Sequence, residues 1–225
     1  MSNTVTFEDR ITVPFIHGWD EFCAWVHSPQ FPQTGRIDYL TGSIEVDMSP
    51  EDLFSHGSLK IEVASAIHQR VRQLDCGSVW TDSTRVSCPE AGVSSEPDIV
   101  YLSHQAVESQ RVRLVPKASG DRDRFVEIEG APDLIVEIVS DSSVEKDTHR
   151  LPPLYFQAGV LEWWLIDARS EQLRFTIHRR GSDGFAVTKS DADGFQRSEV
   201  LDCWYRLDRD RDALGWPRFV LSEKS

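Results

Sequence analysis

The chain has 225 residues, of which 40% are hydrophobic, and this is enough to bury one substantial core. Its formal net charge of -13 argues against a protein that holds nucleic acid by charge alone, because an acidic surface repels the phosphate backbone. No run approaches the ~18 apolar residues of a membrane span, and the start of the chain lacks the basic and apolar regions of a signal peptide. We therefore expect a cytoplasmic protein with a single domain over residues 1–225.

The N-terminal part of the chain predicts a helical lead and then a β-hairpin. Apolar residues recur at helical spacing over 19–26, inside a lead that we place at residues 1–35. Residues 36–47 alternate as two strands joined by a turn. Glu45 and Asp47 share one face of this hairpin, and a solvated outer face is the favoured interpretation over a site.

A long helix is expected from residue 54 to residue 74, where apolar side chains form one stripe. His56 lies near its start, so its imidazole could reach a site, although a lone histidine is more often a cap or a solvated group. Strands are expected over 78–83, 85–88 and 96–102.

The stretch 131–167 predicts a strand, a helix and a parallel strand. Its first run, 134–139, is aliphatic except for Glu137, and an unpaired carboxylate in a buried strand costs several kcal/mol, roughly. Glu137 therefore needs a cation, a metal or a strong donor; the alternative is a glutamate that reaches solvent at the strand end. The helix is expected over 144–158 and the second strand over 161–167, with ligands beyond the carboxyl ends of the strands.

Two fragments, 97–100 and 132–135, each place a Pro-Asp pair before a buried strand, and we expect the two strands to be neighbours. Neighbouring strands lie ~5 Å apart, so Asp98 and Glu137 could hold Mg²⁺ or Mn²⁺ at the C-terminal ends of their strands. The carbonyl of Ile138 is a candidate third ligand. Such an ion can polarise the phosphoryl oxygen of a phosphodiester.

Residues 103–124 form a polar insertion, and residues 111–124 carry a net charge of +3. Arg111 and Arg113 are the candidate substrate-binding residues of this segment, against the alternative of a solvated basic loop. The core is expected over residues 36–170, followed by a β extension over 171–225.

These motifs resemble those of the Uma2 family of restriction-endonuclease-like proteins, in the PD-(D/E)XK nuclease superfamily. The matching pieces are Met48-Ser49-Pro50 followed by His56, Glu96-Pro97-Asp98, Pro132 to Ser140, the Asp147 to Tyr155 spacing, Ala158-Gly159-Val160 before Glu162 to Asp167, and Arg197 to Leu201. The resemblance covers nearly the whole chain. It implies an α/β (α+β) fold with a mixed β-sheet flanked by helices, in which Asp98 and Glu137 are the two acidic motif residues of a nuclease that acts on DNA.

The chain departs from this family at the lysine. The position two residues after Glu137 is Val139, and the position at which the family has a lysine on the following helix is Leu151. Pro152 and Pro153 follow and suggest a break or a late helix start.

Lys146 and Arg150 are the available substitutes for that lysine. Lys146 is the expected catalytic cation, and Arg150 is expected to clamp phosphate, because the pKa of a guanidinium is too high for proton transfer.

Two functions remain open from the sequence. The first is a Mg²⁺- or Mn²⁺-dependent endonuclease, and the second is a non-catalytic module of the same fold that binds nucleic acid or protein. A two-carboxylate sugar hydrolase is a third class, with only the seven tryptophans in its favour. The oligomeric state is also open, a homodimer included.

Overall fold

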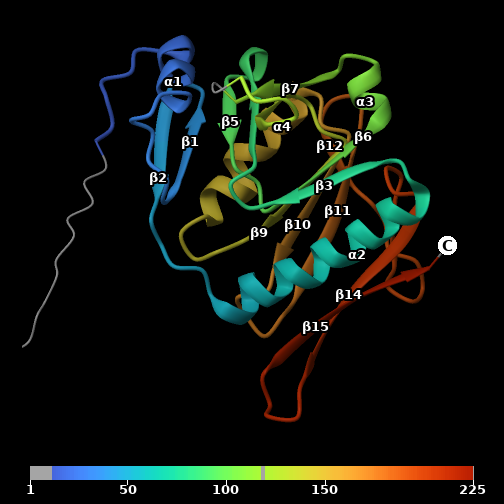
Figure 1. Cartoon of the computed structure of the whole chain (residues 1–225). Helices are drawn as coiled ribbons and strands as arrows, with labels where there is room; N and C mark the ends of the chain where they lie inside the picture. Colours follow the sequence, from blue (N-terminus) through green and yellow to red (C-terminus); the bar gives the residue numbers. More distant parts are fainter. Residues whose placement is uncertain (1–11, 118–119, 225) are drawn as a thin grey trace, which may run out of the picture.

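A computed structural model describes residues 12–117 and 120–224, so residues 1–11 of the expected lead and the start of the chain lie outside it. The described part contains three β-sheets with helices packed between and around them (Figure 1). Among the described residues, no helix has both the length and the apolar character needed to cross a membrane.

The central sheet has six strands and contains the segments that carry the sequence motifs. In spatial order these are β12 (Phe185–Val187), β11 (Arg174–Arg180), β10 (Glu162–Asp167), β9 (Leu134–Ile138), β6 (Ile99–Ser103) and β3 (Gly77–Thr81).

Two further sheets and a set of helices surround the central sheet. A second six-stranded sheet runs in the order β2 (Ser43–Asp47), β1 (Arg36–Leu40), β5 (Val93–Ser95), β4 (Arg85–Cys88), β8 (Phe125–Gly130) and β7 (Val112–Pro116). A third sheet consists of β13 (Gln196–Ser198), β14 (Cys203–Arg211) and β15 (Pro217–Lys224). The helical elements are α1 (Trp19–Val26), η1 (Leu53–Ser58), α2 (Leu59–Leu74), η2 (Pro89–Ala91), α3 (His104–Glu108), η3 (Lys146–Arg150) and α4 (Leu151–Ala158).

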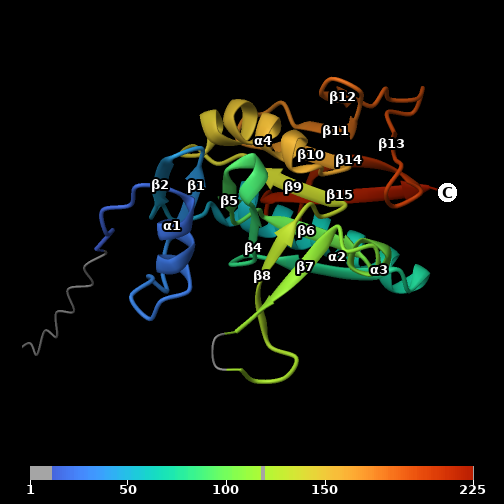
Figure 2. The same ribbon diagram turned by 90° about the horizontal axis from the view of Figure 1, so that it is seen from above.

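The central sheet is covered on both faces, which explains why β9 is apolar on both. Val63 of α2 and Val136 of β9 belong to one apolar cluster, which also includes residues of β14 and β15. Ile135, on the other face of β9, packs with Leu151 and Tyr155 of α4 and with residues of the second sheet. Figure 2 shows α2 and α4 on opposite sides of β9. Burying an aliphatic side chain stabilises a fold by ~1.5–3 kcal/mol, so the sandwiched strand anchors the molecule.

The predicted neighbours β6 and β9 do pair, and β9 runs parallel to β10 as expected. One detail of the prediction is wrong. Because β6 is antiparallel to β9, Asp98 lies just before the start of β6, at the N-terminal end of its strand, while Glu137 lies at the C-terminal end of β9. An antiparallel partner begins where its neighbour ends, so this arrangement still brings the two residues to the same edge.

Both predicted long helices contain a π-helical turn near their start. The first starts as η1, capped by Asp52, whose side chain accepts from the amides of Phe54 and Ser55. The second is helical over residues 144–158, as expected, with the π-turn η3 directly before α4 and proline in the first turn of α4. The late start suggested by the two prolines is therefore wrong; the prolines instead follow a local change from α-helical to π-helical hydrogen bonding, since proline has no amide donor. π-turns are rare and occur often at functional sites.

Gly130 closes β8 at a backbone φ of +111°, and a Cβ there would collide with the carbonyl oxygen of Arg111. We expect Gly130→Ala to lower the free energy of unfolding by ~2 kcal/mol or more, because left-handed backbone alone costs an L-residue ~1–2 kcal/mol. Gly184→Ala is the matched control, since its Cβ would meet no atom within 4 Å. Urea denaturation of both variants checks this, and equal midpoints would contradict it.

Candidate functional site

Asp98 and Glu137 lie opposite each other on one face of the central sheet. The register pairs Ile99 with Val136, and the next position places Asp98 opposite Glu137. Side chains directly opposite in an antiparallel pair share a face. Asp98 is 0% exposed and Glu137 is 2% exposed, so two carboxylates are buried side by side. Such a pair requires compensating charge within the fold.

Cations surround the Asp98 carboxylate. Its Oδ2 accepts a 2.7 Å hydrogen bond from the amide of Ile138, and its Oδ1 accepts a 3.0 Å bond from the guanidinium of Arg36. His56 Nε2 and Lys60 Nζ lie 3.4 and 3.5 Å from the same Oδ1. Burial alone would raise the pKa of Asp98, but His56, Arg36 and Lys60 hold that pKa below its ordinary value. Asp98 is therefore ionised at neutral pH.

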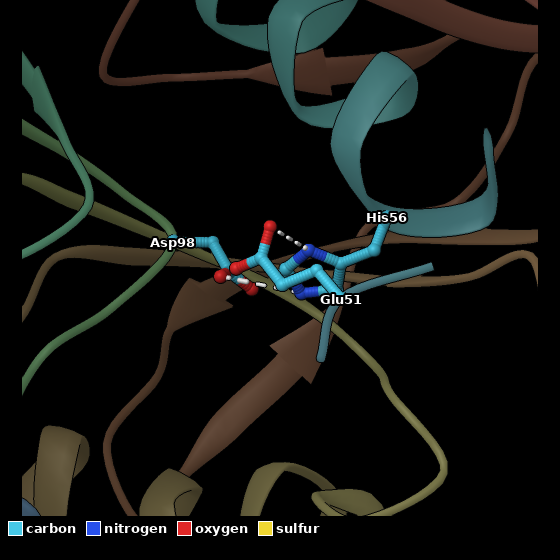
Figure 3. Close-up of side chains that lie close together, drawn as sticks. All are labelled: Glu51, His56 and Asp98. Carbon is cyan, nitrogen blue, oxygen red and sulfur yellow. Dashed lines mark ion pairs between the residues drawn. The ribbon is translucent and has the colours of Figure 1, made fainter. Parts of the chain in front are cut away.

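His56, Glu51 and Asp98 point toward one another at this place, as Figure 3 shows. His56 Nδ1 lies 3.2 Å from Glu51 Oε2, and ligand atoms of the three residues lie within 4.8 Å of one another. Burial lowers the pKa of His56, but its contacts with Asp98 outweigh burial and raise the pKa. The predicted approach of His56 to the cleft is present in the structure.

Glu137 has different surroundings. Tyr155 of α4 donates a 2.5 Å hydrogen bond to Glu137 Oε1, and its hydroxyl also lies 3.1 Å from Ser95 Oγ. Burial, then the charges of Asp147 and Asp98, raise the pKa of Glu137 well above its ordinary value. The hydroxyl of Tyr155 is thus the strong donor that was one of the partners expected for Glu137, and the raised pKa favours a bound cation or a proton there as well.

Lys146 extends from η3 into the same cluster. Its Nζ donates a 2.8 Å hydrogen bond to Asp38 Oδ2, and only 11% of the lysine side chain is exposed. Burial lowers its pKa, but Asp38, Asp147 and Glu137 together raise that pKa above its ordinary value. Lys146 is therefore a permanent cation beside the acidic pair, and its replacement of the missing lysine stays a prediction.

Asp147 is a further buried acid that the sequence interpretation used only as a spacing marker. Its Oδ2 accepts from Ser143 Oγ, and among the described residues its buried Oδ1 has no hydrogen-bond partner. Burial raises its pKa to about 6, against the lowering effect of Lys146. The cluster thus holds more acid than its cations neutralise.

Two adjoining cavities open onto the charged residues around Asp98 and Glu137, although neither cavity is lined by those two carboxylates. One, of about 380 Å³, includes Glu51 and His56, and the other, of about 500 Å³, includes Asp38 and Lys146. They share Arg36 among their lining residues. A solvent-accessible space therefore reaches both ends of the acidic cluster.

The β1–β2 hairpin faces this site, so the favoured interpretation of Glu45 and Asp47 as a solvated outer face is wrong. Glu45 pairs with Arg150 of η3, and Asp47 Oδ2 accepts a 2.7 Å hydrogen bond from Ser142 Oγ. Asp38 is the register partner of Glu45, so Lys146 and Arg150, four residues apart, reach two opposed residues of one hairpin. The hairpin closes one side of the site.

The structure does not bring Arg111 and Arg113 to this cluster. Arg111 pairs with Asp133, which precedes β9 and so lies at the opposite end of that strand from Glu137. Arg113 pairs with Glu129 on β8. Both guanidinium groups already have carboxylate partners there, so phosphate binding by either stays a prediction that no contact with the site supports.

The sequence interpretation did not assign four charged residues of the cluster to the site: Arg36, Asp38, Glu51 and Lys60. Lys60 carried a signal, because it lies four residues after His56 and on the buried stripe of α2 with Val63. A lysine on an apolar stripe needs an acidic partner. Arg36 and Asp38 gave a weaker signal, because alternation in a short strand does not show whether its polar face lies against a functional site or in solvent.

A family model described as "Putative restriction endonuclease", Uma2, matches residues 19–205, which is more than half of the chain. The chain belongs to the Uma2 family. Among solved structures, it is similar to a "putative nuclease belonging to DUF820" from Anabaena variabilis, with a TM-score of 0.59 and 19% identity, over 81% of this chain and 89% of that one. This likeness shows the fold alone, and the predicted mixed sheet flanked by helices is confirmed. No curated protein matches the sequence.

The donor set of this Uma2 protein suits a divalent cation. Asp98 and Glu137 offer hard oxygen ligands, which Mg²⁺ and Mn²⁺ prefer. The raised pKa of Glu137 and the unpartnered Oδ1 of Asp147 both indicate buried acid without enough positive charge. Asp98 also belongs to the second donor set, with Glu51 and His56. The ligand atoms of this second set lie within 4.8 Å of one another, and the two sets share Asp98.

Asp147 makes stability depend on pH. Its pKa rises from 3.8 to about 6 on folding, so the folded state binds the proton more tightly and stability is lost as pH rises from 4 to 6. We expect Asp147→Asn, measured in EDTA, to raise the free energy of unfolding above pH 6 by up to ~3 kcal/mol, and to have little effect below pH 4. Urea denaturation across this range checks it. Parallel pH profiles for the two proteins would contradict it.

Proposed function

We propose that this protein is a divalent-metal-dependent endonuclease that hydrolyses DNA phosphodiester bonds. The observation that carries the proposal is the placement of Asp98 opposite Glu137, with Lys146 and His56 beside them, at one edge of the central sheet. Membership of a family described as "Putative restriction endonuclease" supports it. The cavities at this edge give a substrate access to the cluster.

Asp98 and Glu137 would hold the ion, with the carbonyl of Ile138 as the predicted third ligand. When bound, a divalent ion polarises the phosphoryl oxygen and lowers the pKa of a bound water. His56 and Arg36 keep Asp98 ionised and fix its carboxylate, so this ligand is oriented before substrate arrives. Tyr155 fixes Glu137 in the same way through its 2.5 Å hydrogen bond.

Lys146 supplies the positive charge for the attacked phosphate. Its raised pKa keeps it protonated at neutral pH, so it stabilises the negative charge that develops on the phosphoryl oxygens. Arg150, paired with Glu45 at the edge of the site, would clamp a neighbouring phosphate after exchanging that partner.

One observation favours a second candidate, a non-catalytic module of the same fold that binds nucleic acid or protein. Leu151, at the family's lysine position, is 1% exposed and packs in the apolar cluster with Ile135 and Tyr155. With an apolar side chain packed in the core at this position, the acidic pair can serve to bind a partner without catalysing a reaction.

Metal binding tests the ligand assignment. We expect Asp98→Asn and Glu137→Gln each to weaken Mn²⁺ binding at least ~10-fold in isothermal titration calorimetry, because a direct ligand matters at least as much as its supporting groups. Glu145→Gln is the matched control, since this glutamate is 77% exposed. Glu51→Gln separates the two donor sets. If Glu51→Gln abolishes binding and Glu137→Gln does not, the ion belongs with Glu51, His56 and Asp98.

Cleavage tests the role of the cation. We expect slow, Mn²⁺-dependent nicking of DNA that Lys146→Ala reduces by ~10²-fold or more, as loss of one charge-stabilising group does in other enzymes. Leu151→Lys is expected to strengthen cleavage, because residue 151 precedes Tyr155 by one helical turn and Tyr155 contacts Glu137.

Lys189→Ala, at an exposed lysine, is the control for that experiment. Unchanged nicking by Lys146→Ala would reject the proposal that Lys146 takes the place of the family's lysine. No nicking by any variant, Leu151→Lys included, would favour the binding module.

A further inference from the structure

A third cavity adjoins the site on the side away from Lys146. It has a volume of about 590 Å³ and lies between the loop that follows α1, the turn between β3 and β4, and strand β8. Three of its lining residues, Gly35, Ser83 and Glu96, also line the cavity that contains Glu51 and His56. The two spaces therefore meet, and a chain molecule bound at the acidic cluster can continue into this cavity.

Aromatic rings line this third cavity. Phe31, Trp80 and Phe125 come from three separate segments of the chain and are all part of its wall. Phe125 is 52% exposed, so its ring is accessible to a bound molecule. Flat apolar surfaces of this kind bind planar rings by stacking.

The polar groups of the cavity exclude a phosphate. Glu96, Asp123 and Glu127 line it, against one arginine, Arg85. The guanidinium of Arg85 pairs with Glu96, donates to the carbonyl of Ile37 and to Ser94 Oγ, and lies 5.2 Å from the Phe31 ring. Arg85 is thus committed to Glu96, and Glu127 is bonded to His27 and Ser87. Among the described lining residues, the carboxylate of Asp123 is therefore the one placed to accept from an N–H donor and to repel an anion.

We infer that this cavity binds an unpaired nucleobase adjacent to the scissile phosphate. The inference rests on the proposed function and narrows its substrate class to nucleic acid with unpaired bases. A nucleobase combines a flat ring, which fits between aromatic side chains, with edge N–H groups that carboxylates accept. Within a duplex the ring of a base is stacked between its neighbours and its pairing edge is occupied. The substrate must therefore be single-stranded or locally opened.

The overall charge supports this choice of substrate. A formal net charge of -13 opposes the binding of a duplex through many phosphate contacts. Stacking does not require a basic surface, so it adds affinity that does not depend on phosphate contacts.

The test is fluorescence anisotropy with a fluorescein-labelled 12-nucleotide DNA, either single-stranded or annealed to its complement. The full chain is measured in Ca²⁺, and a denaturing gel confirms that the DNA stays intact. We expect the single strand to bind at least tenfold more tightly than the duplex. Phe125→Ala should weaken single-strand binding about fivefold or more, the effect of one lost base–aromatic contact, and Phe125→Trp should restore it.

Phe15→Ala is the matched control, because Phe15 is 86% exposed and lies outside the cavity lining. Equal binding of duplex and single strand, no binding of either, or an unchanged affinity in Phe125→Ala would overturn the inference. An RNA strand of the same sequence shows whether the base comes from DNA or RNA. Equal affinity for the two strands supports recognition of the base alone, and weaker binding of the RNA supports a base within DNA.

A parallel nicking assay separates this inference from the proposed function. Duplex nicking that Phe125→Ala leaves unchanged would retain the endonuclease and reject the base cavity. Single-strand binding that depends on Phe125, without cleavage in Mn²⁺ by any variant, would support the base cavity and reject the endonuclease.

Discussion

Buried negative charge at the end of β9 is the constraint on which the rest of this structure depends. Asp98 and Glu137 lie opposite each other and are almost fully enclosed. A buried carboxylate without a partner costs several kcal/mol, roughly, so the fold must bring cations to it. It does so from several directions: Arg36 comes from β1, His56 from η1, Lys60 from α2 and Lys146 from η3. The second sheet and both π-turns are held in place by these pairs as well as by apolar packing.

The same constraint bears on residue 151, where the chain has leucine in place of a lysine. Leu151 joins the apolar cluster beneath α4, and the prolines after it lie in the first turn of α4. The residues before it form a π-turn, which places Lys146 over Asp38 and near Glu137. The cation nearest the acidic pair on this side thus lies in the π-turn, five residues before Leu151. Positive charge therefore lies beside the acidic pair without a lysine at residue 151.

The sequence was sufficient for the core elements and the acidic pair, because both depend on local patterns. An aliphatic run interrupted by Glu137, and a second Pro-Asp before a strand, predict two buried neighbouring strands with a carboxylate on each. The hairpin could not be placed in this way. Its alternation fits a solvated face equally well, and only the tertiary structure shows that Glu45 meets Arg150 and Asp47 meets Ser142. Long-range pairs of this kind leave no periodic signal.

The direction of β6 shows the limit of reasoning from strand ends. Ligand sites beyond the carboxyl ends of strands follow from parallel pairing. Here β9, the strand that carries Glu137, is parallel to β10 and antiparallel to β6. Asp98 therefore reaches the site from the beginning of β6. That difference has a structural consequence: the backbone amide of Ile138 points at Asp98 and donates to it at 2.7 Å. The antiparallel pairing thus supplies a fixed donor to the buried carboxylate, which a parallel pairing would have directed elsewhere in the sheet.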